Sequence, residues 1–378
     1  MILPSQRDLF EIPDAVAYLN CAYMSPLLRA ARAAGEAALA RKSQPWRITP
    51  HDFFADSEAA RGLFAELIGA DADGVALIPA ASYGLALAAA NLPIREGQRI
   101  LVLEDQFPSN VYAWRDLAAR TGAVVETVPR PADFDWTAAL LERIDERTAI
   151  VAVPHCHWTD GSLVNLVRVG ERARAVGAAL VVDATQSLGA APLSVGEVRP
   201  DFLVAATYKW LLGPYSMGFL YAAPAWRDGR PLEFNWIARE GSEDFAGLVR
   251  HRDTFQPGAR RYDVGEKSNF ALVPVALAGL RQIVAWQVAS IAETLSELTG
   301  AVERGAVQVG LHAIPAERRA AHMIGLRAER PLPVDLPARL AAEQVFVSVR
   351  GNSIRVSPHL YNTPGDVERL LAVLAGAL

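Results

Sequence analysis

The chain has 378 residues, of which 51% are hydrophobic and 21% charged, and its formal net charge is −5. This composition can supply a sizeable core and excludes intrinsic disorder, while the absence of a basic excess argues against a general nucleic-acid-binding protein. The length predicts two or three domains, or one large domain and one small one.

Short apolar runs alternate with helical segments along the first two thirds of the chain. We expect strands at residues 16–20, 75–78, 99–103, 123–128, 149–153, 179–182 and 202–206. We expect helices at residues 27–42, 57–68, 83–91, 110–121 and 166–176. This alternation predicts an α/β fold with a mainly parallel sheet covered by helices on both faces.

The pattern weakens after residue 221. Residues 224–256 lack periodicity and are expected to form loops, and an arginine-rich connector follows at 257–269. The remaining elements predict a smaller C-terminal α/β domain: a helix at 273–298, strands at 324–326, 345–349 and 353–356, and a closing helix at 364–378. We therefore expect an N-terminal segment and large domain at 1–256, and a connector and small domain at 257–378.

Two of the apolar strands end at residues of opposite charge. The run 179–182 leads into Asp183, with Gln186 three residues later, and the run 202–206 leads into Thr207, Tyr208 and Lys209. Ligands of parallel α/β sheets collect where strands end, so Asp183 and Lys209 are expected to share one crevice. Buried charges are costly unless a ligand uses them. Pyridoxal 5′-phosphate does so, because a lysine forms an imine with its aldehyde and an aspartate pairs with its ring nitrogen. The ordinary alternative is a strand-end lysine that reaches solvent.

The same region resembles the class V aminotransferase family of fold-type I pyridoxal phosphate enzymes, which includes cysteine desulfurases, kynureninases and an isopenicillin epimerase. The motifs are D-A-T-Q at 183–186, T-Y-K-W-L-L-G-P at 207–214 and G-F-L-Y at 218–221. The resemblance runs from about Tyr18 to the C-terminus. It implies that Lys209 carries the cofactor, that Asp183 keeps the ring nitrogen protonated and that Gln186 contacts the ring hydroxyl.

The resemblance also indicates how the rest of the cofactor is held. Ser82 matches a hydroxyl of the family's phosphate loop, at a helix start where unpaired N–H groups and the helix dipole favour an anion. Its plain structural role would be an N-cap, and both roles are compatible. Tyr208 matches a phosphate-binding tyrosine of kynureninases, and Thr207 is a weaker candidate of the same kind. Phe107 matches an aromatic residue stacked on the cofactor ring, with core filler as the alternative.

The run His155-Cys156-His157-Trp158 permits two interpretations. Two histidines separated by one residue, with an acid nearby, can bind zinc, but no third and fourth ligand appear at suitable spacing, so we expect no metal. In the family, Trp158 falls where cysteine desulfurases carry asparagine and kynureninase-like members carry an aromatic residue. The resemblance therefore makes Trp158 a substrate-binding candidate and points away from desulfurases.

Arg355 precedes Tyr361-Asn362-Thr363 and matches the family's substrate arginine. A guanidinium holds a carboxylate through two parallel hydrogen bonds, which suits an amino-acid substrate. The alternative is an arginine paired with a surface acid. Arg350 is close in sequence and is a second candidate for the same role.

The resemblance implies that the substrate amine displaces Lys209, which then moves the α-proton. A desulfurase needs a cysteine on the loop before the substrate arginine, and residues 336–354 contain none, so we reject that activity. The leading interpretation is an aminotransferase-like enzyme acting on a small α-amino acid. Kynureninase-like or C–S β-lyase chemistry and epimerisation stay open, whereas a non-catalytic binding protein is disfavoured because Lys209 and Asp183 are both present.

Assembly and location follow from other features. The family implies a homodimer with shared active sites, in which the loop 259–269, with Ser268, corresponds to a segment that reaches the neighbouring subunit's phosphate. Only Cys21 and Cys156 are present, so we expect no disulfides and a reducing compartment. No apolar run is long enough to span a membrane and the first residues do not resemble a signal peptide, which predicts a soluble cytoplasmic protein without membrane or nucleic-acid partners.

Overall fold

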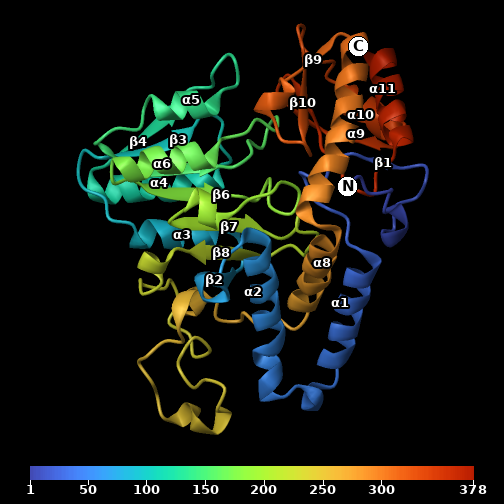
Figure 1. Ribbon diagram of the computed structural model, residues 1–378. Coiled ribbons are helices and arrows are strands. Elements are labelled where there is room, and N and C mark those ends of the chain that lie inside the picture. The colour runs from blue at the N-terminus through green and yellow to red at the C-terminus, as the bar shows by residue number, and fades with distance from the viewer.

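The computed structural model describes residues 1–378 and is built around a seven-stranded sheet in the order β2-β8-β7-β6-β5-β3-β4 (Figure 1). The strands are β2 (Val75–Ile78), β3 (Arg99–Leu103), β4 (Val124–Val128), β5 (Thr148–Pro154), β6 (Ala179–Asp183), β7 (Phe202–Ala206) and β8 (Gly218–Ala222). Only β8 runs antiparallel to its neighbours, and all other pairs are parallel. The mainly parallel α/β sheet that the sequence predicted is confirmed.

Helices cover both faces of this sheet. One face packs on α3 (Ala81–Asn91) and α4 (Ser109–Thr121), and the other on α2 (Ala55–Ile68), α5 (Trp136–Leu141), α6 (Leu166–Ala175) and α7 (Val195–Val198). Within β7, Phe202 and Val204 join the core beneath α3 and α4, whereas Leu203 and Ala205 join the opposite core. Successive strand side chains point to opposite faces, so a strand covered on both sides is apolar at every position.

The small domain contains a four-stranded antiparallel sheet in the order β12-β13-β10-β9. Its elements are α9 (Val288–Gln308), β9 (Leu311–Ala313), β10 (Ile324–Ala328), α10 (Leu336–Ala342), β11 (Val345–Phe346), β12 (Ser348–Arg350), β13 (Ser353–Val356) and α11 (Pro364–Ala377). The run 345–349, expected as one strand, is divided, because β11 pairs with β1 (Ala17–Tyr18) and β12 pairs with β13. The N-terminal segment, which we grouped with the large domain, therefore also contacts the small one.

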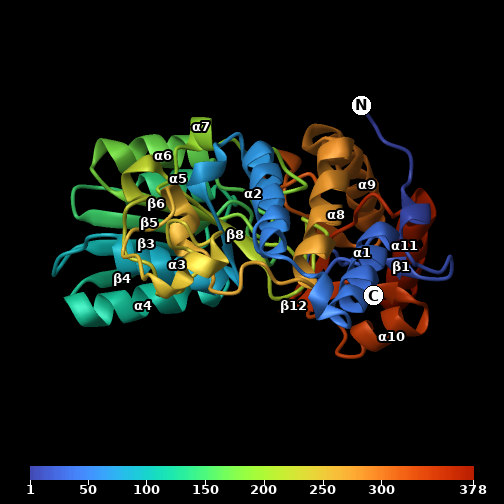
Figure 2. The same cartoon turned by 90° about the horizontal axis from the view of Figure 1, so that it is seen from below.

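The helix expected at 273–298 is two helices. The first, α8 (Leu272–Trp286), ends at Gln287, whose φ of 65° breaks the helical path, and α9 continues at an angle of 79°. No single helix is long and apolar enough to cross a membrane, and the α8–α9 pair meets the length and composition criteria only when its bent halves are counted together. Figure 2 shows the two domains side by side, with α2 and α8 between them.

Two further segments complete the chain. The helix α1 (Arg29–Lys42) packs against α8. Residues 224–256, expected as loops, contain only the short helical turns Pro224–Trp226 and Phe245–Val249, and they project from the sheet at the bottom of Figure 1.

Candidate active site

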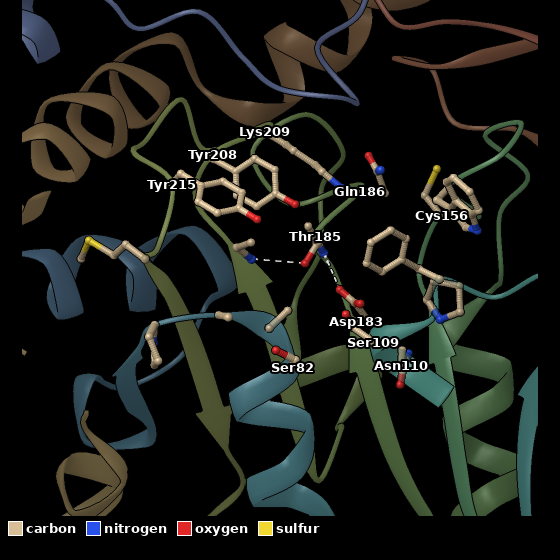
Figure 3. Close-up of a pocket in the computed structure, with 18 of the residues that line it drawn as sticks. Ser82, Ser109, Asn110, Cys156, Asp183, Thr185, Gln186, Tyr208, Lys209 and Tyr215 are labelled. Carbon is tan, nitrogen blue, oxygen red and sulfur yellow. Dashed lines mark hydrogen bonds between the residues drawn. The ribbon is translucent and has the colours of Figure 1, made fainter. Parts of the chain in front are cut away.

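A cavity of about 230 Å³ lies where the parallel strands of the large sheet end. Its walls come from the segments that follow β2, β3, β5, β6 and β7, and Figure 3 shows their side chains around one space. Most of the residues selected from the sequence line it: Ser82, Phe107, Trp158, Asp183, Gln186, Tyr208 and Lys209. Thr207 and Arg355 do not line the cavity.

Lys209 is the reactive amine of this cavity. It follows β7 and is only 6% exposed, and its Nζ lies 5.4 Å from the ring centre of Phe107 and 5.3 Å from that of Tyr208. Burial lowers the pKa of Lys209 to about 8, although the nearby Asp183 carboxylate opposes this change. No carboxylate forms an ion pair with it. A substantial fraction of the amine is therefore neutral, and nucleophilic, close to physiological pH.

Asp183 is a buried acid without a cationic partner. It ends β6, and its Oδ1 accepts a hydrogen bond of 3.0 Å from the backbone N–H of Thr185. Burial raises the pKa of Asp183, while the Thr185 hydrogen bonds and the charge of Lys209 oppose the increase. A carboxylate in this position is ready to pair with a protonated ligand nitrogen.

The amide of Gln186 has a fixed orientation. Its Nε2 donates to the Ala22 carbonyl at 3.1 Å, and its Oε1 accepts from Trp210 Nε1 at 3.1 Å. Because the carbonyl can only accept and the indole N–H can only donate, the amide cannot be turned over. His322 Nε2 bonds to the backbone carbonyl of Gln186, at 2.7 Å. One amide N–H is left for the cavity.

Phe107 and Trp158 form an aromatic corner. Their rings meet edge to face, with centroids 5.6 Å apart, and Trp158 Nε1 donates to the Asp105 carbonyl at 2.6 Å. Phe107 is 39% exposed and lines the cavity, so it is not core filler. Both rings are placed to contact a planar ligand beside Lys209.

Of the three residues proposed to bind the cofactor phosphate, two line the cavity and one does not. The prediction that Ser82 caps α3 is wrong, because the extended residue Ala80 precedes the helix and Ser82 lies in its first turn, exposed to the cavity. Tyr208 lines the wall, with its ring 4.7 Å from that of Tyr215, and burial raises its pKa to about 12. Thr207 lies outside, where its hydroxyl donates to the Pro214 carbonyl at 2.7 Å and helps to close the turn after β7.

Arg355 is a buried cation without a counterion. On β13 it is 2% exposed, and it donates from Nη1 to the Trp158 carbonyl at 2.6 Å and from Nη2 to Ser348 Oγ at 3.3 Å. Its Nε has no partner, and no carboxylate pairs with it, which excludes the alternative of an ion pair with a surface acid. Burial lowers its pKa to about 10. The side chain therefore lies between the two domains, in contact with Trp158 of the large domain and Ser348 of the small one.

Of the two histidines in the run before Trp158, His157 has structural contacts. His157 engages Thr159 Oγ1 at 2.8 Å through Nδ1 and the Glu104 carbonyl at 3.1 Å through Nε2. No group of three His, Cys, Asp or Glu side chains is arranged to hold a metal ion. Pro154, Cys156 and Trp158 line the cavity instead.

Several cavity residues were not predicted: Ser109, Asn110, Cys156, Thr185, Tyr215 and Ser216. The position of Cys156 could have been predicted from the sequence, because alternation continued from Pro154 places Cys156 on the same side as Trp158. Thr185 also joins the ends of β6 and β7, since its Oγ1 accepts from the Ala206 N–H at 3.2 Å. The turn after Lys209 brings Tyr215 to the cavity. The shape of this turn depends on the Thr207 hydroxyl, and we recognised no sequence signal for it.

The chain is similar in sequence to known proteins. The family model described as aminotransferase class V matches residues 49–370. The uncharacterized aminotransferase YcbU of Bacillus subtilis is 28% identical over 84% of this chain and 83% of its own length. Isopenicillin N epimerase of Streptomyces clavuligerus is 29% identical over 54% of this chain and 52% of its own.

Solved structures share the fold. A cysteine desulfurase from Thermococcus onnurineus NA1 has a TM-score of 0.85 at 21% identity. The match covers 100% of this chain and 99% of the desulfurase chain. A C-DES mutant with glycine covalently linked to its pyridoxal phosphate cofactor has a TM-score of 0.88 at 19% identity, over 99% of this chain and 100% of its own. The predicted fold-type I architecture is confirmed.

Proposed function

The chain belongs to the class V aminotransferase family of pyridoxal 5′-phosphate-dependent enzymes, and from this premise we propose that it transfers the amino group of a small α-amino acid with Lys209 as the catalytic residue. The observation that supports this proposal most is that a buried amine, Lys209, and a buried carboxylate, Asp183, line the same cavity without forming an ion pair.

The cavity residues fit this cofactor. Lys209 would hold its aldehyde carbon, Asp183 its ring nitrogen and the free amide N–H of Gln186 its ring hydroxyl, with Phe107 against the ring. The first turn of α3, with Ser82, and the hydroxyl of Tyr208 would hold the phosphate, because a helix start presents unpaired N–H groups. When bound, the cofactor draws electrons away from the substrate α-carbon.

Lys209 would then move a proton at that carbon. An amine with a pKa of about 8 accepts a proton and returns it near neutral pH, where one with a pKa of 10.5 would stay protonated. Asp183, held by Thr185, would keep the cofactor nitrogen protonated. Arg355, which bonds to the carbonyl of the cavity residue Trp158, would bind the substrate α-carboxylate through its free Nε at the border of the cavity, and Trp158 would contact the substrate.

We also propose a homodimer. Large aromatic side chains are exposed near the cavity and on the projecting loops: Tyr215 is 63% exposed, Phe234 63% and Trp236 40%. Monomers rarely expose several such groups together. Ser268 lies on the connector loop in a hollow that it shares with Trp236, and its contact with the other subunit's phosphate remains a prediction. Sedimentation equilibrium of the loaded enzyme should give twice the chain mass.

Product analysis tests the reaction. Loaded enzyme is incubated with an amino acid and a keto-acid acceptor. Amino-group transfer predicts that a keto acid with the intact substrate skeleton accumulates with the new amino acid. Pyruvate or alanine together with a released fragment would instead show lyase chemistry, and a change in chirality alone would show epimerisation.

A further inference from the structure

The small-domain sheet presents an arginine-rich face to the large domain. In the sheet register, Arg355 lies opposite Ser348, and Ser353 lies opposite both Arg350 and Arg327. Cross-strand partners and residues two apart share a face, so these five side chains lie together. Their contacts show where the face points: Arg355 bonds to the Trp158 carbonyl, Arg327 to Asp160, and Arg350 packs over the Trp158 ring.

Only part of this positive charge is neutralised. Asp160, which is fully buried, bonds to Arg130 at 2.5 Å and to Arg327 at 3.2 Å. Arg350 and Arg355 form no ion pair with any acid. Arg350 donates one hydrogen bond, to the carbonyl of its own neighbour Val349 at 3.0 Å, and Arg355 leaves Nε unused.

The two unpaired guanidinium groups repel each other. Burial and then the charge of Arg350 lower the pKa of Arg355, and both arginines add to the effect of burial in lowering the pKa of Lys209. Both arginines contact Trp158, which lines the same cavity as Lys209, so they lie at the border of that cavity. Ser353 Oγ, on the same face, is buried without a partner as well. Charges and hydroxyl groups left in this state are costly to fold around unless an anion binds to them.

We propose that Arg355 and Arg350 together select a substrate with two anionic groups, an α-carboxylate on Arg355 and a side-chain carboxylate or similar oxyanion on Arg350. This inference rests on the proposed function, because it requires the amino acid to enter the cavity beside Lys209. The two cations contact different parts of Trp158, its carbonyl and its ring, so they suit two separate groups better than a single carboxylate. A guanidinium stacked on an indole keeps its in-plane N–H groups available for a bidentate bond.

The first test compares acids with their amides. Loaded wild type is titrated with L-aspartate, L-asparagine, L-glutamate, L-glutamine and L-alanine while the absorbance of the bound cofactor is followed. At least one acid should bind about tenfold or more tightly than its amide, and Arg350→Gln should reduce that preference to about twofold or less, with a much smaller change in the binding of alanine. Absence of the preference in wild type, or its survival in Arg350→Gln, would overturn the proposal.

Arg327→Gln is the matched control, because Arg327 shares the face but is already paired with Asp160. Arg327→Gln should keep the preference for acids over amides. An equal loss of this preference would mean that the overall positive charge of the face, and not Arg350 itself, selects the substrate.

A second readout does not depend on chemistry at the cofactor. Calorimetry of the loaded enzyme with succinate, glutarate and butyrate should show at least one dicarboxylate binding more tightly than the monocarboxylate in wild type and not in Arg350→Gln. If no amino acid changes the spectrum but the dicarboxylates still discriminate, the proposed function fails and the anion site stands. If alanine titrates normally and neither dicarboxylates nor acidic amino acids bind better, the anion site fails and the proposed function stands.

Discussion

Replacing Lys209 by methionine should stabilise the cofactor-free protein, because the side chain is placed for chemistry at the expense of folding. Methionine is similar in length, apolar and easily accommodated. The wild-type amine must either carry a charge inside the cavity or release its proton, and no ion pair compensates it.

The magnitude follows from the pKa. A decrease from 10.5 to about 8 corresponds to about 3 kcal/mol at pH 7, at about 1.36 kcal/mol per tenfold change in proton affinity. The pKa of about 8 already includes the attraction by Asp183, so about 3 kcal/mol is the expected net gain. Wild-type stability should rise between pH 8 and 10.5, because only the unfolded chain still binds the proton there. The advantage of the variant should therefore disappear above this window.

Denaturant unfolding of both cofactor-free proteins at pH 7 and pH 10.5 measures the effect. Lys267→Met is the matched control, since Lys267 is 2% exposed but forms an ion pair with Asp263 at 3.0 Å, and the loss of this pair should destabilise the protein. If Lys209→Met is less stable than wild type at pH 7, or its gain is the same at both pH values, the description of Lys209 as an uncompensated buried amine is refuted.

Two further substitutions address the cavity. Asp183→Asn should keep the circular dichroism of wild type and lower kcat/KM by about tenfold to a hundredfold, since a lost charge-assisted bond costs about 1.5–3 kcal/mol; near-normal turnover would remove Asp183 as the ring partner. Arg355→Lys should load with cofactor normally but lose most of its preference for amino acids over the matching amines, because lysine lacks the bidentate fork; an unchanged preference would make Arg355 structural and transfer its role to Arg350.

The sequence predicted the large domain well because its signals are local. Strands covered on both faces must be apolar throughout, and parallel topology then brings the residues that follow them to one edge. This reasoning joined Asp183 and Lys209 across 26 positions of sequence without knowledge of any contact. Phe107 and Trp158 were assigned to the site from the resemblance to the family.

The remaining features depend on contacts between distant segments. The run 345–349 is divided because β1, more than 300 residues earlier, pairs with part of it. The helix break at Gln287 has no glycine or proline beside it that would have predicted it from the sequence. The environment of Arg355 exists only after the small domain packs against Trp158, so sequence alone could not show that this cation has no acidic partner.

The claim that Lys209 carries the cofactor can be tested directly, because the chain contains only three lysines. Lys42 is exposed, Lys267 is paired with Asp263, and Lys209 alone lines the cavity. Borohydride reduction of the loaded enzyme followed by peptide mapping should place a pyridoxyl group on Lys209 and leave Lys42 and Lys267 unmodified. A pyridoxyl group on either of those lysines, or none on a loaded sample, would contradict the account.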